Sequence, residues 1–147
     1  MARIDGPCAY KATTVPAYQT REHIRELLRK HGASAVALQD VEVNGQRNVG
    51  LRFQRGDRVV RVQAVMGETA QEERQRLRAL YWWLKTLLEQ AEFGMLTFDE
   101  LFLAHLEVAL PGNRGTATVQ EIVGPQLGRF ELPDMSRLLK MLPPGEG

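Results

Sequence analysis

The chain has 147 residues, of which 44% are hydrophobic and 25% charged, and its formal net charge is +1. These values are typical of one globular domain, and they argue against a disordered or strongly basic chain. The lone Cys8 excludes an internal disulfide, and no apolar run suits a transmembrane helix or a secretory signal, so we predict one cytoplasmic domain over residues 1–147.

The N-terminal part predicts a short strand followed by a helix. Residues 8–15 alternate weakly and contain β-branched side chains, which favour a strand that ends at Pro16. Thr20 is a suitable N-cap for a helix that runs through His31 and stops at Gly32. The apolar side of this helix consists of residues spaced three and four apart, namely Ile24, Leu27, Leu28 and His31.

Two turn motifs predict a three-stranded antiparallel meander. Asn44-Gly45 and Gly56-Asp57 each suit a two-residue hairpin turn. Counting outward from both turns fixes the register of all three strands, and it places apolar residues of each strand on one face. The rows on this face are Val36–Phe53–Val60 and Leu38–Leu51–Val62.

A threonine followed three residues later by a glutamate predicts the start of three further helices. These capping boxes are Thr69 with Glu72, Thr97 with Glu100, and Thr118 with Glu121. The first opens a long helix that stops at Gly94. Pro111, Gly112 and Gly115 predict a loop before the third capping box. A last short helix is predicted behind Pro133 from four apolar residues, Met135, Leu138, Leu139 and Leu142.

These elements together predict an α+β domain. The expected order is β-α-β-β-β-α-α followed by short C-terminal helices, with helices packed on one face of the three-stranded sheet. The N-terminal strand could be added to this sheet, and residues 143–147 are expected to fray.

Charge is distributed unevenly along the chain, and this asymmetry locates a first candidate surface. Residues 47–85 contain nine basic and four acidic residues, whereas residues 86–112 contain five acidic and no basic residues. On the second sheet face the register places Arg52 opposite Arg61, and Arg55 and Arg58 flank the nearby turn. Facing arginines repel unless an anion or a carboxylate from the acidic segment intervenes, and the plainest alternative is that both are solvated.

The Trp82-Trp83 pair gives a second candidate surface. Adjacent helix residues point about 100° apart, so Trp83 is expected at the edge of the core stripe and Trp82 on the far side, beside Arg78 and Lys85. C-terminal helices could cover Trp82. Left exposed, it would suit a partner protein as a hot spot, or unpaired bases as a stacking platform.

The residue patterns of the common catalytic sites are missing from the sequence. The three histidines lack metal-binding spacing, one cysteine cannot form a thiolate cluster, and no glycine motif for phosphates or dinucleotides is present. Asp99 and Glu100 are explained by the start of a helix. We therefore expect no catalytic residue, no metal, no cofactor and no enzymatic activity.

Four short motifs form a series along the chain. They are Val15-Pro16, Gly32-Ala33, Lys85 with Leu88-Glu89, and Thr97-Phe98-Asp99. In this series the chain resembles a group of small proteins of bacteriophages and phage-like mobile elements. Segment 111–118 and the tryptophan pair depart from the group. The resemblance implies a setting among factors for replication, recombination or interference with the host, and it implies no activity.

Two functions follow from the candidate surfaces. The first is a non-enzymatic accessory factor of a phage-like element, with binding of DNA or RNA by Arg52, Arg61, Arg55, Arg58, Trp82, Arg78 and Lys85. The second is a protein-interaction module or homodimer, in which the basic and acidic segments of two chains complement each other. Neither function involves a membrane or a metal.

Overall fold

The computed structural model describes residues 13–130, 136 and 140–141. The helices and strands in chain order are α1 (Ala17–Lys30), β1 (Ala35–Val43), β2 (Gln46–Arg55), β3 (Arg58–Val65), α2 (Ala70–Glu92), α3 (Phe98–Phe102), β4 (Glu107–Ala109), β5 (Thr116–Thr118) and α4 (Val119–Val123). The α+β class is confirmed. Within the described part of the chain, no helix has the length and apolarity needed to cross a membrane.

Strands β1, β2 and β3 form the predicted meander in the predicted register. Val36 pairs with Phe53, and Phe53 with Val60. Asn44 and Gly45 have φ angles of 51° and 79°, the positive values that a tight turn between twisted strands requires. The turn chemistry and the apolar pattern therefore specify the same pairing.

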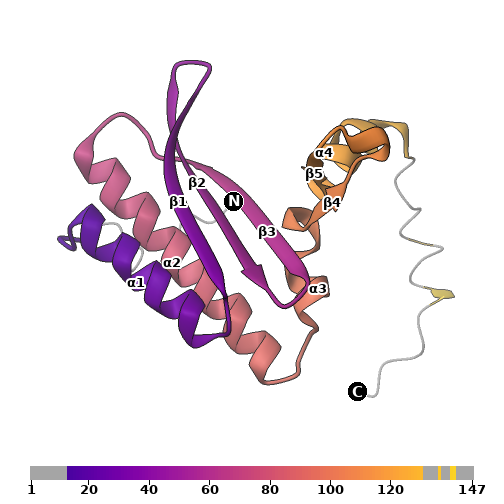
Figure 1. The fold of residues 1–147 in the computed structure, drawn as a ribbon, viewed down its shortest axis with the longest axis horizontal. Coiled ribbons are helices and arrows are strands. Elements are labelled where there is room, and N and C mark those ends of the chain that lie inside the picture. Colours follow the sequence, from indigo (N-terminus) through magenta and orange to yellow (C-terminus); the bar gives the residue numbers. More distant parts are fainter. Residues whose placement is uncertain (1–12, 131–135, 137–139, 142–147) are drawn as a thin grey trace.

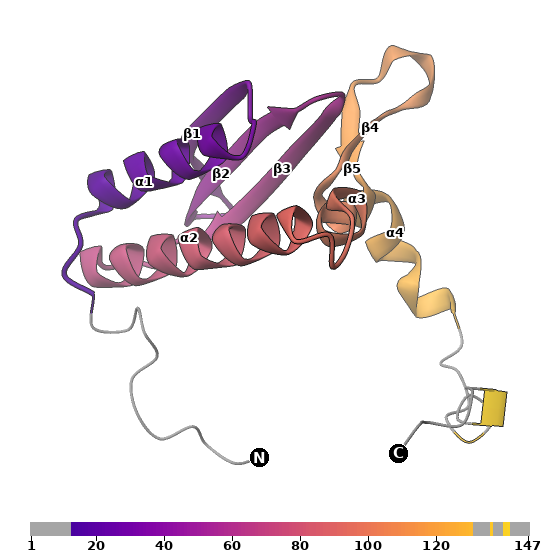
Figure 2. The same cartoon turned by 90° about the horizontal axis from the view of Figure 1, so that it is seen from below.

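Helices α1 and α2 lie side by side against one face of this sheet (Figures 1 and 2). Their buried side chains meet those of the sheet in one core, which includes Ile24, Leu28, Leu51, Phe53, Val60, Leu80, Leu84 and Leu88. Each such side chain stabilises the fold by about 1.5–3 kcal/mol when fully buried. In the described part of the chain no helix covers the opposite face (Figure 1), which we call the open face. Its residues are Ala35, Ala37, Gln39, Val41, Val43, Gln46, Asn48, Gly50, Arg52, Gln54, Val59, Arg61, Gln63 and Val65.

The segment after α2 returns to the edge of the sheet at β3 (Figure 2). Phe102 is fully buried, and its ring meets those of Phe53 and Trp83 at centroid distances of 5.9 Å each. Leu106 then forms an isolated antiparallel bridge with Val60 of β3. This bridge fixes the position of the next residue, Glu107, beside the sheet.

A second, two-stranded sheet is the main element that the sequence did not predict. Strand β4 pairs with β5, with Glu107 opposite Thr118 and Ala109 opposite Thr116. Each strand has only three residues, too few for alternation to stand out, and the intervening segment has the composition of a loop. The capping boxes at Thr97 and Thr118 are both present as predicted, and Thr69 accepts a hydrogen bond from the Glu72 backbone N–H.

The predicted start of α1 was wrong. The helix begins at Ala17 because the Pro16 carbonyl accepts hydrogen bonds from the backbone N–H groups of Gln19 and Thr20, both at 3.1 Å. Thr20 is fully buried within the helix instead of capping it. Residues 13–16 form no strand, and the rest of the predicted N-terminal strand lies outside the described residues, as does the apolar stripe of the predicted last helix.

Candidate functional site

Arg52 and Arg61 face each other across β2 and β3, and the carboxylate of Glu107 lies between them. Glu107 Oε1 accepts hydrogen bonds from Arg52 Nε at 2.9 Å and from Arg61 Nε at 3.0 Å. Its Oε2 accepts a third from Arg52 Nη2 at 2.8 Å. Of the alternatives that the sequence leaves open, the structure therefore shows a carboxylate from the acidic segment between the two arginines.

Glu107 is shielded by its own partners. Its side chain is only 5% exposed, although the Arg52 side chain above it is 58% exposed. The hydrogen bonds from Arg52, together with the charges of Arg52 and Arg61, hold the pKa of Glu107 below its ordinary value, against the opposing effect of burial. The carboxylate is therefore ionised at neutral pH.

Glu121, near the start of α4, binds the outer side of Arg61. Its Oε1 accepts a hydrogen bond from Arg61 Nη2 at 2.6 Å and another from the Thr118 backbone N–H at 2.9 Å. The Thr118 N–H and the Arg61 charge lower the pKa of Glu121. The charges of two arginines, Arg52 and Arg61, are thus balanced by those of two carboxylates, Glu107 and Glu121.

The arginines near the Gly56-Asp57 turn are also engaged. Arg58 donates two hydrogen bonds to Asp99, both at 2.9 Å, and they lower the pKa of that carboxyl. Arg55 donates to the His31 carbonyl at 3.0 Å, and its guanidinium lies 4.8 Å from the centre of the Phe98 ring. Arg52, Arg58 and Arg61 are thus each paired with a carboxylate, and Arg55 with a carbonyl and an aromatic ring. Nucleic-acid binding by these four arginines stays a prediction.

Trp82 lies on the outer side of α2, and 41% of it is exposed. The Lys85 Nζ atom lies 5.0 Å from the centre of its ring, and the Tyr81 ring meets it edge-on at 5.5 Å. Arg78 stacks over Tyr81, with 4.5 Å between its Cζ and the ring centre. We call these four residues, Arg78, Tyr81, Trp82 and Lys85, the aromatic–cation cluster.

The two tryptophans have the predicted orientations. Trp83 is partly buried and packs against the core, with its ring 5.4 Å from that of His105. Trp82, by contrast, is one of the exposed large apolar residues in the described part of the chain. The seven predicted site residues consequently belong to three groups. Arg52 and Arg61 lie on the open face, Arg55 and Arg58 lie beside the Gly56-Asp57 turn on the face that the helices cover, and the remaining three lie on α2.

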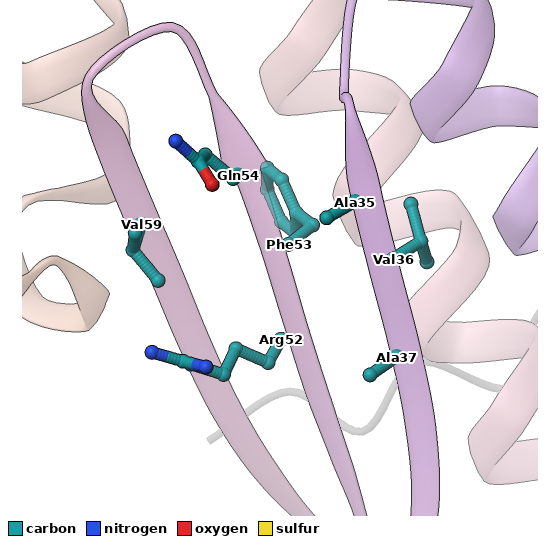
Figure 3. Close-up of a pocket in the computed structure, with 7 residues that line it drawn as sticks. All are labelled: Ala35, Val36, Ala37, Arg52, Phe53, Gln54 and Val59. Carbon is teal, nitrogen blue, oxygen red and sulfur yellow. The ribbon is translucent and has the colours of Figure 1, made fainter.

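The open face is hollowed along its length. One hollow of about 410 Å³ lies over Gly50, between Gln39 of β1 and Gln63 of β3. A second, of about 160 Å³, adjoins it at Ala37 and Arg52, where Arg52 extends from β2 toward β3 (Figure 3). We call the two hollows together the trough. Small residues, Ala35, Ala37 and Gly50, form its floor. The alternation of side chains along the strands already places these residues on one face in the sequence.

Sequence reasoning missed the roles of Glu107 and Glu121. Glu107 is the single charged residue in the apolar run from Leu106 to Leu110, which could have marked it as paired. Among the described residues, no group of three or more His, Cys, Asp or Glu side chains is arranged to hold a metal ion.

Comparison with known proteins adds no assignment to these surfaces. No protein-family model, no curated protein and no solved structure matches the chain.

Proposed function

We propose that the protein is a non-enzymatic interaction module whose open face binds a second copy of the same chain. The observation that supports this most is the Glu107 carboxylate between Arg52 and Arg61. It cancels charge on a sheet face that no described helix covers, and a face of small apolar and amide side chains suits burial against protein. A phosphate would first have to displace Glu107 from three hydrogen bonds.

The relief of the open face supports a second copy as its partner. The trough lies over Ala37 and Gly50, whereas Val43 and Val65 project near the Asn44-Gly45 turn, with 38% and 42% of each residue exposed. A two-fold axis through the middle of two packed sheets would place the valines of each chain over the trough of the other. The same patch then serves both chains, as an isologous interface requires.

The resemblance to phage proteins adds a setting to this proposal. In that setting the chain is a small interaction factor of a phage-like element. Binding of nucleic acid is supported by a different surface, the aromatic–cation cluster.

The self-association proposal is tested by filling the trough. A Cβ atom at Gly50 would lie 3.6 Å from Val41 Cγ2, an ordinary contact, so Gly50→Lys is compatible with the folded sheet. The lysine would occupy the hollow and carry an unpaired charge into the interface. The control is Thr86→Lys, which adds the same charge at an exposed position of α2.

The molar mass is measured by light scattering and sedimentation from about 1 µM to about 100 µM protein, a range that covers ordinary dimer affinities. We expect the mass of the unmodified chain and of Thr86→Lys to rise toward two chains, and that of Gly50→Lys to stay at one. A monomer at every concentration, or equal loss of dimer in both variants, would overturn the proposal.

A further inference from the structure

We infer that the aromatic–cation cluster binds single-stranded nucleic acid, with a base stacked on Trp82 and phosphates held by Arg78, Lys85 and the neighbouring Lys30. This surface lies on the side of the helix layer away from the sheet. The inference therefore does not depend on self-association through the open face.

Trp82 has the position and support of a stacking platform. The residue is 41% exposed, and it lies on the side of α2 opposite the buried Leu80 and Leu84. The edge of Tyr81 at 5.5 Å and the ammonium group of Lys85 at 5.0 Å limit its rotation. An aromatic ring beside a cation is the arrangement on which unpaired bases stack, because every base has a flat π-face.

The cations at this surface keep their charge. Arg78 rests on the Tyr81 ring, and its Nη1 lies 3.1 Å from Nδ1 of His23. Within the described residues neither Arg78 nor Lys30 forms an ion pair with a carboxylate. Arg52, by contrast, is paired with the carboxylate of Glu107 through two hydrogen bonds. The electrostatic attraction for an added anion is therefore stronger at Arg78 than at Arg52.

A groove between α1 and α2 provides room for a strand, and it is linked to Trp82 through Lys85, which lines the groove and contacts the Trp82 ring. It has a volume of about 300 Å³, and its lining includes Lys30, Arg78 and Lys85 together with the carboxylates of Glu26 and Glu89. The three cations outnumber the two carboxylates, and the Lys85–Glu89 contact is loose, with 3.9 Å between Nζ and Oε1. Such a short site suits two or three nucleotides of a single strand, whereas a duplex needs a longer basic surface.

The first measurement uses Trp82 as its own reporter. The chain has two tryptophans, so Trp83→Phe leaves Trp82 as the sole indole. Titration of this variant at low salt with an oligothymidylate of about 12 nucleotides should quench its fluorescence by stacking. Anisotropy of a labelled oligothymidylate with the unmodified chain gives the affinity independently of the Trp83 substitution.

The salt dependence then assigns the cations. Contact with three phosphates predicts a slope of log K against log salt of about −2 for a single strand. Arg78→Gln should reduce the slope to about −1.4, whereas Arg114→Gln, which removes the same charge from an exposed position between β4 and β5, should leave it unchanged. Trp82→Ala should weaken binding about tenfold without changing the slope.

Three results would overturn the inference. The first is no binding at low salt. The second is an equal loss of slope in Arg114→Gln and Arg78→Gln, which would show that the loss reflects net charge and not a contact at Arg78. The third is equal quenching of Trp82 by poly-glutamate, which would assign the surface to an acidic peptide. A monomeric chain that still binds oligothymidylate would overturn only the self-association proposal.

Discussion

The open face and the outer side of the helix layer both carry arginines, but they hold them in different ways. On the open face, Arg52 and Arg61 share the carboxylate of Glu107. On the helix side, Arg78 rests on the Tyr81 ring at 4.5 Å. A carboxylate cancels the charge of its arginine, whereas an aromatic ring orients the guanidinium and leaves its charge intact.

The count of basic residues along a segment therefore does not give the potential of the surface to which they contribute. Segment 47–85 is basic as a whole, yet the part of it that lies on the sheet is neutralised by residues from β4 and α4. The part that lies on α2 is not covered in this way. Where the acidic segment folds back therefore decides which arginines can meet an anion.

Removal of the Glu107 charge should break the open-face arrangement and give the largest effect. In Glu107→Gln the two arginines would face each other without an anion between them, with Glu121 left only on the outer side of Arg61, and an amide nitrogen would meet a guanidinium. We expect the free energy of unfolding to fall by about 2–3 kcal/mol, the range for hydrogen bonds with charged partners.

Urea denaturation followed by circular dichroism measures this loss. The control is Glu22→Gln in α1, which removes an exposed pair with Arg25 at 3.4 Å and should change the free energy by less than about 0.5 kcal/mol. Equal effects of the two substitutions would show that Glu107 stabilises the fold no more than an exposed ion pair does.

Acidification should give a smaller loss on the same side of the molecule. The folded-state pKa values of Glu107 and Glu121 lie below the ordinary 4.5, so the unfolded chain binds more protons as the pH falls. Their stabilisation is present above pH 4.5 and is lost as the pH falls through the lower folded values. Burial also lowers the pKa of His105 from 6.5, so a first, shallow loss should begin below pH 6.5.

Urea denaturation at a series of pH values separates these contributions. Glu107→Gln should flatten the decline below pH 4.5 and leave the decline between pH 6.5 and pH 4.5 unchanged. An unchanged slope below pH 4.5 in this variant would mean that other carboxyl groups carry the acid sensitivity.

Sequence reasoning predicted the meander because independent local signals agreed. The Asn44-Gly45 and Gly56-Asp57 turns and the apolar alternation all specify one register, and a slip by one residue would turn Phe53 to the open face. The facing of Arg52 and Arg61 follows from that register directly. The outward orientation of Trp82 follows from the spacing of Leu77, Leu80, Leu84 and Leu88 in α2.

The neutralisation of the open face was not predictable in the same way. It depends on the Val60–Leu106 bridge and on the hairpin β4–β5, which bring residues 107 and 121 to residues 52 and 61. Such contacts lie 46 to 60 positions apart in the chain, and no local propensity specifies them. The start of α1 was missed for a local reason, because the Pro16 carbonyl and not a polar side chain begins the hydrogen bonding.

Removal of the Arg78 charge should give the smallest effect of the three. Arg78→Gln loses a cation–π contact with Tyr81 but leaves no buried carboxylate without a partner, so we expect a loss of about 0.5 kcal/mol in the free energy of unfolding. The double mutant with Glu107→Gln should lose the sum of the two single losses, because distant sites without shared partners act independently.

Urea denaturation of the four proteins in this cycle gives the coupling. A coupling near zero means that the two sides hold their arginines independently, so that Arg78 is free to bind a ligand at no cost to the sheet. A loss in Arg78→Gln as large as that in Glu107→Gln would instead make Arg78 a structural residue, and the contrast between the two sides would disappear.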